Sequence, residues 1–147
     1  MKIERLINRL NGNFISTQFR ASLHNSNYHL LCNTRIRKND IEHHLRGPIT
    51  NDFTKITLHT GEHYVMYLIR WGVGNELPKH YHGGMSCVFK QIDGKLEETL
   101  YSNTGGSHKH QLSNGEVCFI DDTMGAHSLM NKNDDYSYSL HIYYHDS

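Results

Sequence analysis

The sequence predicts an all-β barrel or sandwich preceded by a helical segment. Two observations support this expectation. Apolar residues near the N-terminus recur with the period of a helix, and from about residue 53 short runs rich in β-branched and aromatic residues alternate with Gly, Asn and Asp clusters. A length of 147 residues suits one compact domain. We assign residues 1–50 to the helical segment and residues 51–147 to the barrel.

The helical segment is expected from spacing and from stop signals. Four apolar residues follow the 3.6-residue period: Ile3, Leu6, Ile7 and Leu10. Gly12 is expected to end this helix. A short second helix is predicted from a cap at Asn39–Asp40, with Gly47–Pro48 as its stop. Residues 14–31 mix polar and apolar positions without a clean period, so the pattern leaves their structure open.

The barrel is expected from four runs with strand composition: 64–69, 86–89, 116–120 and 136–144. Asp93–Gly94 lies between two apolar runs and indicates a hairpin. Gly61–Glu62 and residues 102–106 are predicted turns. Many short strands separated by turns favour an antiparallel arrangement.

The composition narrows the class of protein. Fifteen basic and fifteen acidic residues give a net charge of zero, which argues against nucleic acid as a partner. No run approaches the roughly 18 apolar residues of a membrane span, and the N-terminus lacks the apolar core of a signal peptide. We therefore expect no membrane partner and a cytoplasmic location. Three scattered cysteines suggest no disulfide framework.

His80-Tyr81-His82 is the first indication of chemistry. Alternate residues of a strand face the same side, so two imidazoles at this spacing can share a metal ion. The alternative is a pair of solvated histidines, a common coincidence in a chain with 13 histidines.

The surroundings of this pair resemble the first sequence motif of the cupin superfamily. Five residues separate Gly74 from His80, four separate His82 from Cys87, and six separate Cys87 from Gly94. The second cupin motif has a counterpart, one residue longer than usual, in Gly115, Asp121, His127 and Asn131. The resemblance implies a small jelly-roll barrel in which one metal ion is held by three residues: His80, His82 and His127.

Within the cupins, the chain resembles the cysteine dioxygenases over about residues 53–144. The resemblance rests on Phe53–Lys55, Trp71–Gly72, Gly94–Leu100, Ile120–His127 and Ser139–Tyr143. It implies an iron(II) enzyme whose three imidazoles act without a carboxylate, because Cys87 stands where most cupins have Glu. A small thiol binds as thiolate, and both atoms of O2 pass to its sulfur. The expected reaction converts L-cysteine to cysteine sulfinic acid.

The resemblance also implies roles for residues beside the iron. In the family, the Cys matching Cys87 can form a thioether with the Tyr matching Tyr143, so we predict this crosslink, with the phenol orienting substrate or oxygen. His141 faces the same side of its strand as Tyr143 and would set the phenol's hydrogen bond, with Ser139 extending the chain. The alternative for the Cys and Tyr is ordinary packing. Trp71 is expected to shape the pocket wall.

Lys55 is the main departure from the family pattern. Cysteine dioxygenases have an Arg there that binds the substrate carboxylate. Lys keeps the charge but not the bidentate fork, so Lys55 is assigned to substrate binding and thiol oxidation is a firmer expectation than cysteine as the substrate. Phe53 stands where a Tyr would add a hydroxyl. Arg70 is expected to be a surface residue on the opposite face of its strand.

Other functions stay open at this stage. The thiol can instead be 3-mercaptopropionate or cysteamine, or the chain can be a non-catalytic metal-binding cupin. A cupin isomerase has no need for the pair of Cys87 and Tyr143. The expected assembly is a monomer or a homodimer. The chain ends soon after Tyr143, so we expect an N-terminal helix or a second subunit to cover the site.

Overall fold

The computed structural model describes residues 2–16, 20–45 and 53–145. The helical part comprises α1 (Lys2–Ser16), α2 (Arg20–Asn33), α3 (Lys38–Ile41) and a 3₁₀ turn (Glu42–His44). The strands of the described residues are β1 (Thr54–Thr60), β2 (Tyr64–Trp71), β3 (Glu76–His80), β4 (Ser86–Asp93), β5 (Leu96–Tyr101), β6 (Ser107–Gln111), β7 (Val117–Ile120), β8 (Ala126–Asn131) and β9 (Ser137–Tyr144). No helix in these ranges is both long and apolar enough to cross a bilayer.

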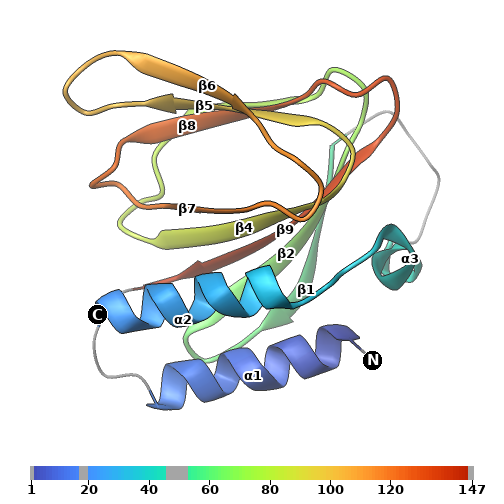
Figure 1. Ribbon diagram of the computed structural model, residues 1–147, viewed down its shortest axis with the longest axis vertical. Coiled ribbons are helices and arrows are strands. Elements are labelled where there is room, and N and C mark those ends of the chain that lie inside the picture. Colours follow the sequence, from blue (N-terminus) through green and yellow to red (C-terminus); the bar gives the residue numbers. More distant parts are fainter. Residues whose placement is uncertain (1, 17–19, 46–52, 146–147) are drawn as a thin grey trace.

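The strands form two antiparallel sheets that face each other. One sheet has the order β1-β2-β9-β4-β7 and the other the order β3-β8-β5-β6. Figure 1 shows the second sheet lying over the first, with α1 and α2 side by side beneath the first. The predicted all-β jelly-roll barrel with an N-terminal helical segment is confirmed.

Alternation along the strands of the first sheet separates two cores. On β9, Leu140 and Ile142 face outward and pack with the apolar faces of the helices, whereas Tyr143 faces the space between the sheets. The helices thus cover the outer face of the first sheet. The expectation that an N-terminal helix covers the site is wrong for α1 and α2, because their apolar residues are used on that opposite face.

Two local predictions about the helices need correction. Gly12 does not end α1, which continues to Ser16. The ambiguous segment after Phe14 contains α2, and over residues 23–33, where burial is described, its buried positions are Leu23, Asn27 and Leu31. This four-residue spacing gives a narrow contact face, and so little apolar signal. Gly47–Pro48, the predicted stop of the short helix, lies outside the described residues.

The turn at Asp93–Gly94 is present, but it is not a hairpin. Strand β4 pairs with β7 and β9, whereas β5 pairs with β6 and β8, so the turn carries the chain from one sheet to the other. Gly94 has φ of 110°, and a Cβ there would lie 2.1 Å from Ser137 Oγ. Only glycine fits this crossing. The turns at Gly61–Glu62 and residues 102–106 do join paired strands, β1 to β2 and β5 to β6.

Candidate metal centre

Three histidines bring their ring nitrogens together between the sheets. His80 ends β3, His82 lies in the loop that follows, and His127 lies on β8 directly opposite His80. One ring nitrogen of each lies within 4.8 Å of the others, a spacing that suits one metal ion. His80 and His82 do not lie on one face of a continuous strand, as the spacing predicted. The strand ends at His80, and the loop that follows turns His82 toward the other two histidines.

Hydrogen bonds fix which nitrogen of two rings is free. His80 Nδ1 lies 2.8 Å from the carbonyl oxygen of Pro78, and His127 Nδ1 lies 2.8 Å from Glu98 Oε2. Both partners are acceptors, so both rings carry their proton on Nδ1 and present a lone pair on Nε2. The two Nε2 atoms face each other at 3.1 Å. Two lone pairs at this distance repel unless a cation lies between them.

His82 supplies a second indication of a cation site. Both of its ring nitrogens are buried and have no hydrogen-bond partner, which is rare for a buried polar group. Burial, helped by the neighbouring His127 and His80, lowers the pKa of His82 to about 4, and burial also lowers the pKa of His80. The rings are therefore neutral, the form that binds metal. A set of three imidazole ligands fits a first-row divalent ion such as iron(II).

Asp122, a residue to which the sequence patterns assign no role, holds the loop that carries His82. Asp122 accepts hydrogen bonds from the backbone N–H groups of His82, at 2.7 Å, and Gly84, at 2.8 Å. These bonds lower the pKa of the Asp122 carboxyl. Glu98 is the other supporting carboxylate, and it is 4% exposed. Both carboxylates lie in segments that resemble the cysteine dioxygenases, but their hydrogen bonds with His127 and His82 form only in the folded chain.

Cys87 and Tyr143 lie beside this cluster. They are directly opposed on β4 and β9, which places the thiol beside the phenol. Burial raises the pKa of both groups, and the neighbouring thiol adds to the effect on Tyr143. The Tyr143 ring centroid lies 6.1 Å from that of His82. A neutral thiol and a neutral phenol thus lie next to the histidine nitrogens that could hold a metal ion.

A buried chain of hydrogen bonds leads to His141. Trp71 Nε1 donates to Ser139 Oγ at 2.8 Å, and Ser139 Oγ lies 2.7 Å from His141 Nε2. Because the indole can only donate, the serine oxygen accepts from it, and the serine hydroxyl proton is free to be donated to His141. Burial lowers the pKa of His141 to about 3, so this ring is neutral as well. Trp71 therefore does more than shape a wall, since its N–H orients the serine.

Lys55 reaches the same side of the first sheet from its edge strand. Its Nζ lies 4.0 Å from the ring centroid of Tyr67 and 5.9 Å from that of Tyr143. After burial and neighbouring histidines, the Lys55 charge is a further cause of the lowered pKa of His80 and His141. Lys55 is thus an exposed cation at the margin of the histidine cluster.

Phe53 and Arg70, whose roles were considered together with that of Lys55, lie in different surroundings. Phe53 is 38% exposed and its ring packs edge-on against Trp71. Arg70 faces away from the site, as expected, but it is only 7% exposed, so its assignment as a surface residue is wrong. Its guanidinium lies over the ring of Tyr136 and is within 3.5 Å of Thr54 Oγ1, which buries it on the outer face.

The sequence profile of cysteine dioxygenase type I matches residues 49–146. This match covers two-thirds of the chain. The chain belongs to the cysteine dioxygenase type I family. No curated protein is significantly similar to it in sequence.

Solved structures agree with this family at the level of the fold. A cupin superfamily protein from Desulfitobacterium hafniense has a TM-score of 0.57 at 15% identity, over 69% of this chain and 85% of that one. A protein from Thermus thermophilus has a TM-score of 0.58 at 16% identity, over 75% and 96% of the two chains. At such identities the likeness shows the cupin fold alone.

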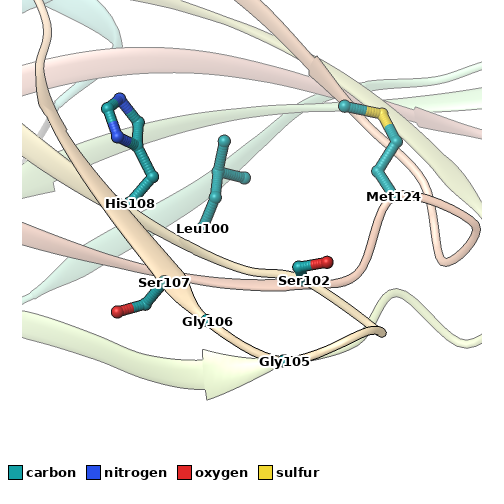
Figure 2. A pocket seen from close by; sticks show the side chains of 7 residues that line it. All are labelled: Leu100, Ser102, Gly105, Gly106, Ser107, His108 and Met124. Carbon is teal, nitrogen blue, oxygen red and sulfur yellow. The ribbon is translucent and has the colours of Figure 1, made fainter.

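This cysteine dioxygenase family member also has a pocket of about 410 Å³ at the end of the β5–β6 hairpin. Leu100 is directly opposite His127 on one side and His108 on the other, so the pocket begins one strand away from a metal-binding residue. Figure 2 shows the side chains of Leu100, His108 and Met124 around this space. The remaining lining residues are Ser102, Gly105, Gly106 and Ser107.

Proposed function

We propose that this protein is an iron(II)-dependent thiol dioxygenase that oxidises L-cysteine to cysteine sulfinic acid. The observation that carries the proposal is the three-imidazole cluster, a group without a carboxylate among the described residues, beside the opposed pair of Cys87 and Tyr143. The reaction is balanced by its two substrates. One thiol and one O2 give one sulfinic acid, with both oxygen atoms on sulfur and no other reductant.

The three histidines would hold the metal, with Glu98 keeping the Nδ1 proton on His127 and thereby its Nε2 lone pair free. When bound, iron(II) supplies a redox-active ion with open positions for a thiolate and O2. Cys87 stays protonated, since burial raises its pKa, and so does not compete with the substrate thiolate.

Tyr143 would orient the substrate or oxygen through its hydroxyl. Burial raises the pKa of this phenol, which keeps it a hydrogen-bond donor near neutral pH. The chain from Trp71 through Ser139 to neutral His141 would limit the movement of the strand face that presents it. The His141 and Tyr143 rings are nearly parallel, with centroids 6.4 Å apart.

Lys55 would bind the substrate carboxylate. Its Nζ is close enough to Tyr143 for one small molecule to contact both. A single ammonium offers rotatable donors instead of the planar fork of arginine, so it selects a carboxylate with less geometric specificity.

Because lysine selects a carboxylate less specifically than arginine, a second candidate function remains, that of a dioxygenase for 3-mercaptopropionate or cysteamine. The former needs Lys55 and the latter does not, because cysteamine has no carboxylate. A non-catalytic metal-binding cupin is the remaining alternative. It requires no reaction at the metal and gives no role to the opposed Cys87 and Tyr143.

The deciding experiment is oxygen uptake by protein loaded anaerobically with iron(II), with L-cysteine, 3-mercaptopropionate and cysteamine in parallel. Uptake with one molecule of cysteine sulfinate formed per O2 supports the proposal. Uptake with only another thiol moves the substrate and keeps the reaction type. No uptake with any of the three, with iron measured in the protein, leaves the metal-binding cupin.

A further inference from the structure

A cationic pocket lies away from the metal centre, between α1 and the end of α2. Its volume is about 190 Å³. Four basic residues line it: Lys2, Arg5, Arg9 and Arg35. Asn33 and Thr34 add polar groups, and Leu6, which is 1% exposed, closes the floor. In a chain whose net charge is zero, this is a local concentration of positive charge.

The helix gathers three of these cations on one face. At 100° per residue, positions 2, 5 and 9 lie within a narrow arc beside the buried stripe, and Glu4 lies on the other side of the helix. Arg5 and Arg9 are four residues apart, and like charges at this spacing repel. The arrangement therefore opposes helix stability unless a counter-charge is present.

The protein itself supplies little of that counter-charge. Lys2 pairs with Asp40 at 3.3 Å. Among the residues that the structure describes, no carboxylate lies within ion-pair distance of Arg5, Arg9 or Arg35. Three arginines thus line one small pocket without an acidic partner among the described residues.

The arginines are not needed to cap α2 either. The buried ammonium of Lys90 donates to the carbonyl oxygens of Leu31, at 2.7 Å, and of Thr34. The Thr34 hydroxyl donates to the carbonyl oxygen of Leu30 at 2.7 Å. The carbonyls of Leu30, Leu31 and Thr34 at this helix end thus have donors other than the arginines.

We propose that this pocket binds the phosphoryl group of a small metabolite or inorganic phosphate. Guanidinium groups match phosphate oxygens in paired hydrogen bonds. A volume of about 190 Å³ equals that of about six water molecules at about 30 Å³ each, which suits a phosphoryl group with its first hydration. The site is independent of the thiol dioxygenase proposal.

The test is calorimetric titration of the iron-loaded protein with inorganic phosphate and, separately, with phenyl phosphate, at an ionic strength held constant with NaCl. Saturable binding in the millimolar range or tighter is expected, and the two titrants separate free phosphate from a phosphate monoester. The double variant R5Q/R9Q should bind at least about tenfold more weakly, since hydrogen bonds between charged groups are the strong ones. The matched control is K95Q/K109Q, which removes two positive charges elsewhere.

Thermal unfolding gives a second readout that a failure to fold cannot imitate. At low ionic strength without phosphate, R5Q/R9Q should unfold at a higher temperature than the wild type, because the repulsion is gone. Phosphate should raise the unfolding temperature of the wild type and of K95Q/K109Q more than that of R5Q/R9Q. General stabilisation by phosphate as an excluded salt acts on all three alike.

Three outcomes would overturn the inference. The first is titration without saturation in the wild type. The second is equal phosphate stabilisation of all three proteins. The third is binding to phosphatidylcholine vesicles that contain phosphatidic acid, through Arg5 and Arg9, with no affinity for either soluble phosphate, which would make the face a membrane contact instead.

Discussion

Cys87 and Tyr143 form a directly opposed pair on the neighbouring antiparallel strands β4 and β9, and the thiol lies close enough to the phenol to raise its pKa. Opposed side chains on such strands have Cβ atoms roughly 4.5–5.5 Å apart. The backbone pairing therefore holds the two side chains next to each other before any covalent bond forms.

This pairing predicts a thioether after turnover. The bond forms between Cys87 Sγ and the Tyr143 ring, with loss of one hydrogen from each residue and O2 as the oxidant. Intact mass spectrometry of protein incubated with iron(II), O2 and L-cysteine should find a species lighter by two hydrogen atoms. Cys87→Ser should not produce this species, whereas the control Cys118→Ser should. An unchanged mass in the wild type after many turnovers would contradict the prediction.

Lys55 is predicted to act on substrates according to their carboxylate. Lys55→Met should raise KM for L-cysteine and 3-mercaptopropionate about tenfold or more, since a charged hydrogen bond of about 1.5–3 kcal/mol is lost. KM for cysteamine should stay nearly unchanged, and Lys55→Arg should keep carboxylate binding. Steady-state oxygen uptake measures all three. Equal effects on cysteine and cysteamine would show that Lys55 does not contact the carboxylate.

Glu98 and its neighbour Glu97 offer a matched pair for testing the metal centre. Glu98→Gln should weaken metal affinity roughly 10–100-fold, since it weakens the partner that holds His127 in its tautomer. Glu97→Gln removes the same charge from the other face of β5 and should leave affinity unchanged. Competition with a coloured chelator for cobalt(II) or iron(II) measures both. Equal affinities in the two variants would remove Glu98 from this role.

Gly125 is predicted to set the start of β8 and so the position of His127. Its φ is 126°, and a Cβ there would lie 2.1 Å from the carbonyl oxygen of Tyr101. Gly125→Ala should destabilise the protein and weaken metal binding together. Gly115→Ala is the control, since Gly115 has φ of 86° and nothing within 4 Å of a Cβ. It should cost only the roughly 1–2 kcal/mol of the left-handed backbone, measured by chemical denaturation.

The part of the fold that could be predicted from sequence is the first sheet. Its strands β2 and β9 are rich in aromatic and β-branched residues because one face packs on the helices and the other lines the barrel. The second sheet has a weaker signal in the sequence. Strand β6 reads Ser-His-Lys-His-Gln and is exposed along its length, so no burial pattern marks it. Its place depends on pairing with β5, which is a property of the folded chain.

The candidate site could likewise be predicted only in part from the sequence. The three candidate metal-binding histidines were predicted from motif spacing, and the folded chain brings them together. Glu98 and Asp122 were not given roles, because Glu98 meets His127 across 29 positions and Asp122 meets His82 across 40. The prediction of a hairpin at Asp93–Gly94 is wrong for a related reason. A tight turn specifies a reversal of the chain, and not which strands pair afterwards.

His141 gives a prediction about acid stability whose sign follows from its pKa. Burial lowers the pKa of the folded ring to about 3, whereas an unfolded histidine has a pKa of about 6.5. Below about pH 6.5 the unfolded chain takes up a proton that the folded chain refuses, so stability falls as the pH falls toward about 3. The slope from one such group approaches about 1.4 kcal/mol per pH unit.

Replacing this ring should therefore flatten the acid limb of the stability profile. His141→Gln keeps an acceptor for the Ser139 hydroxyl but cannot titrate. Chemical denaturation of the metal-free protein between pH 4 and pH 6.5 should give a free energy of unfolding that falls less steeply in the variant, by up to one proton. His80 and His82 remain in both proteins, so their contributions cancel in the difference. Parallel profiles would mean that His141 is protonated in the folded protein, and its serine partner would then have to act as an acceptor.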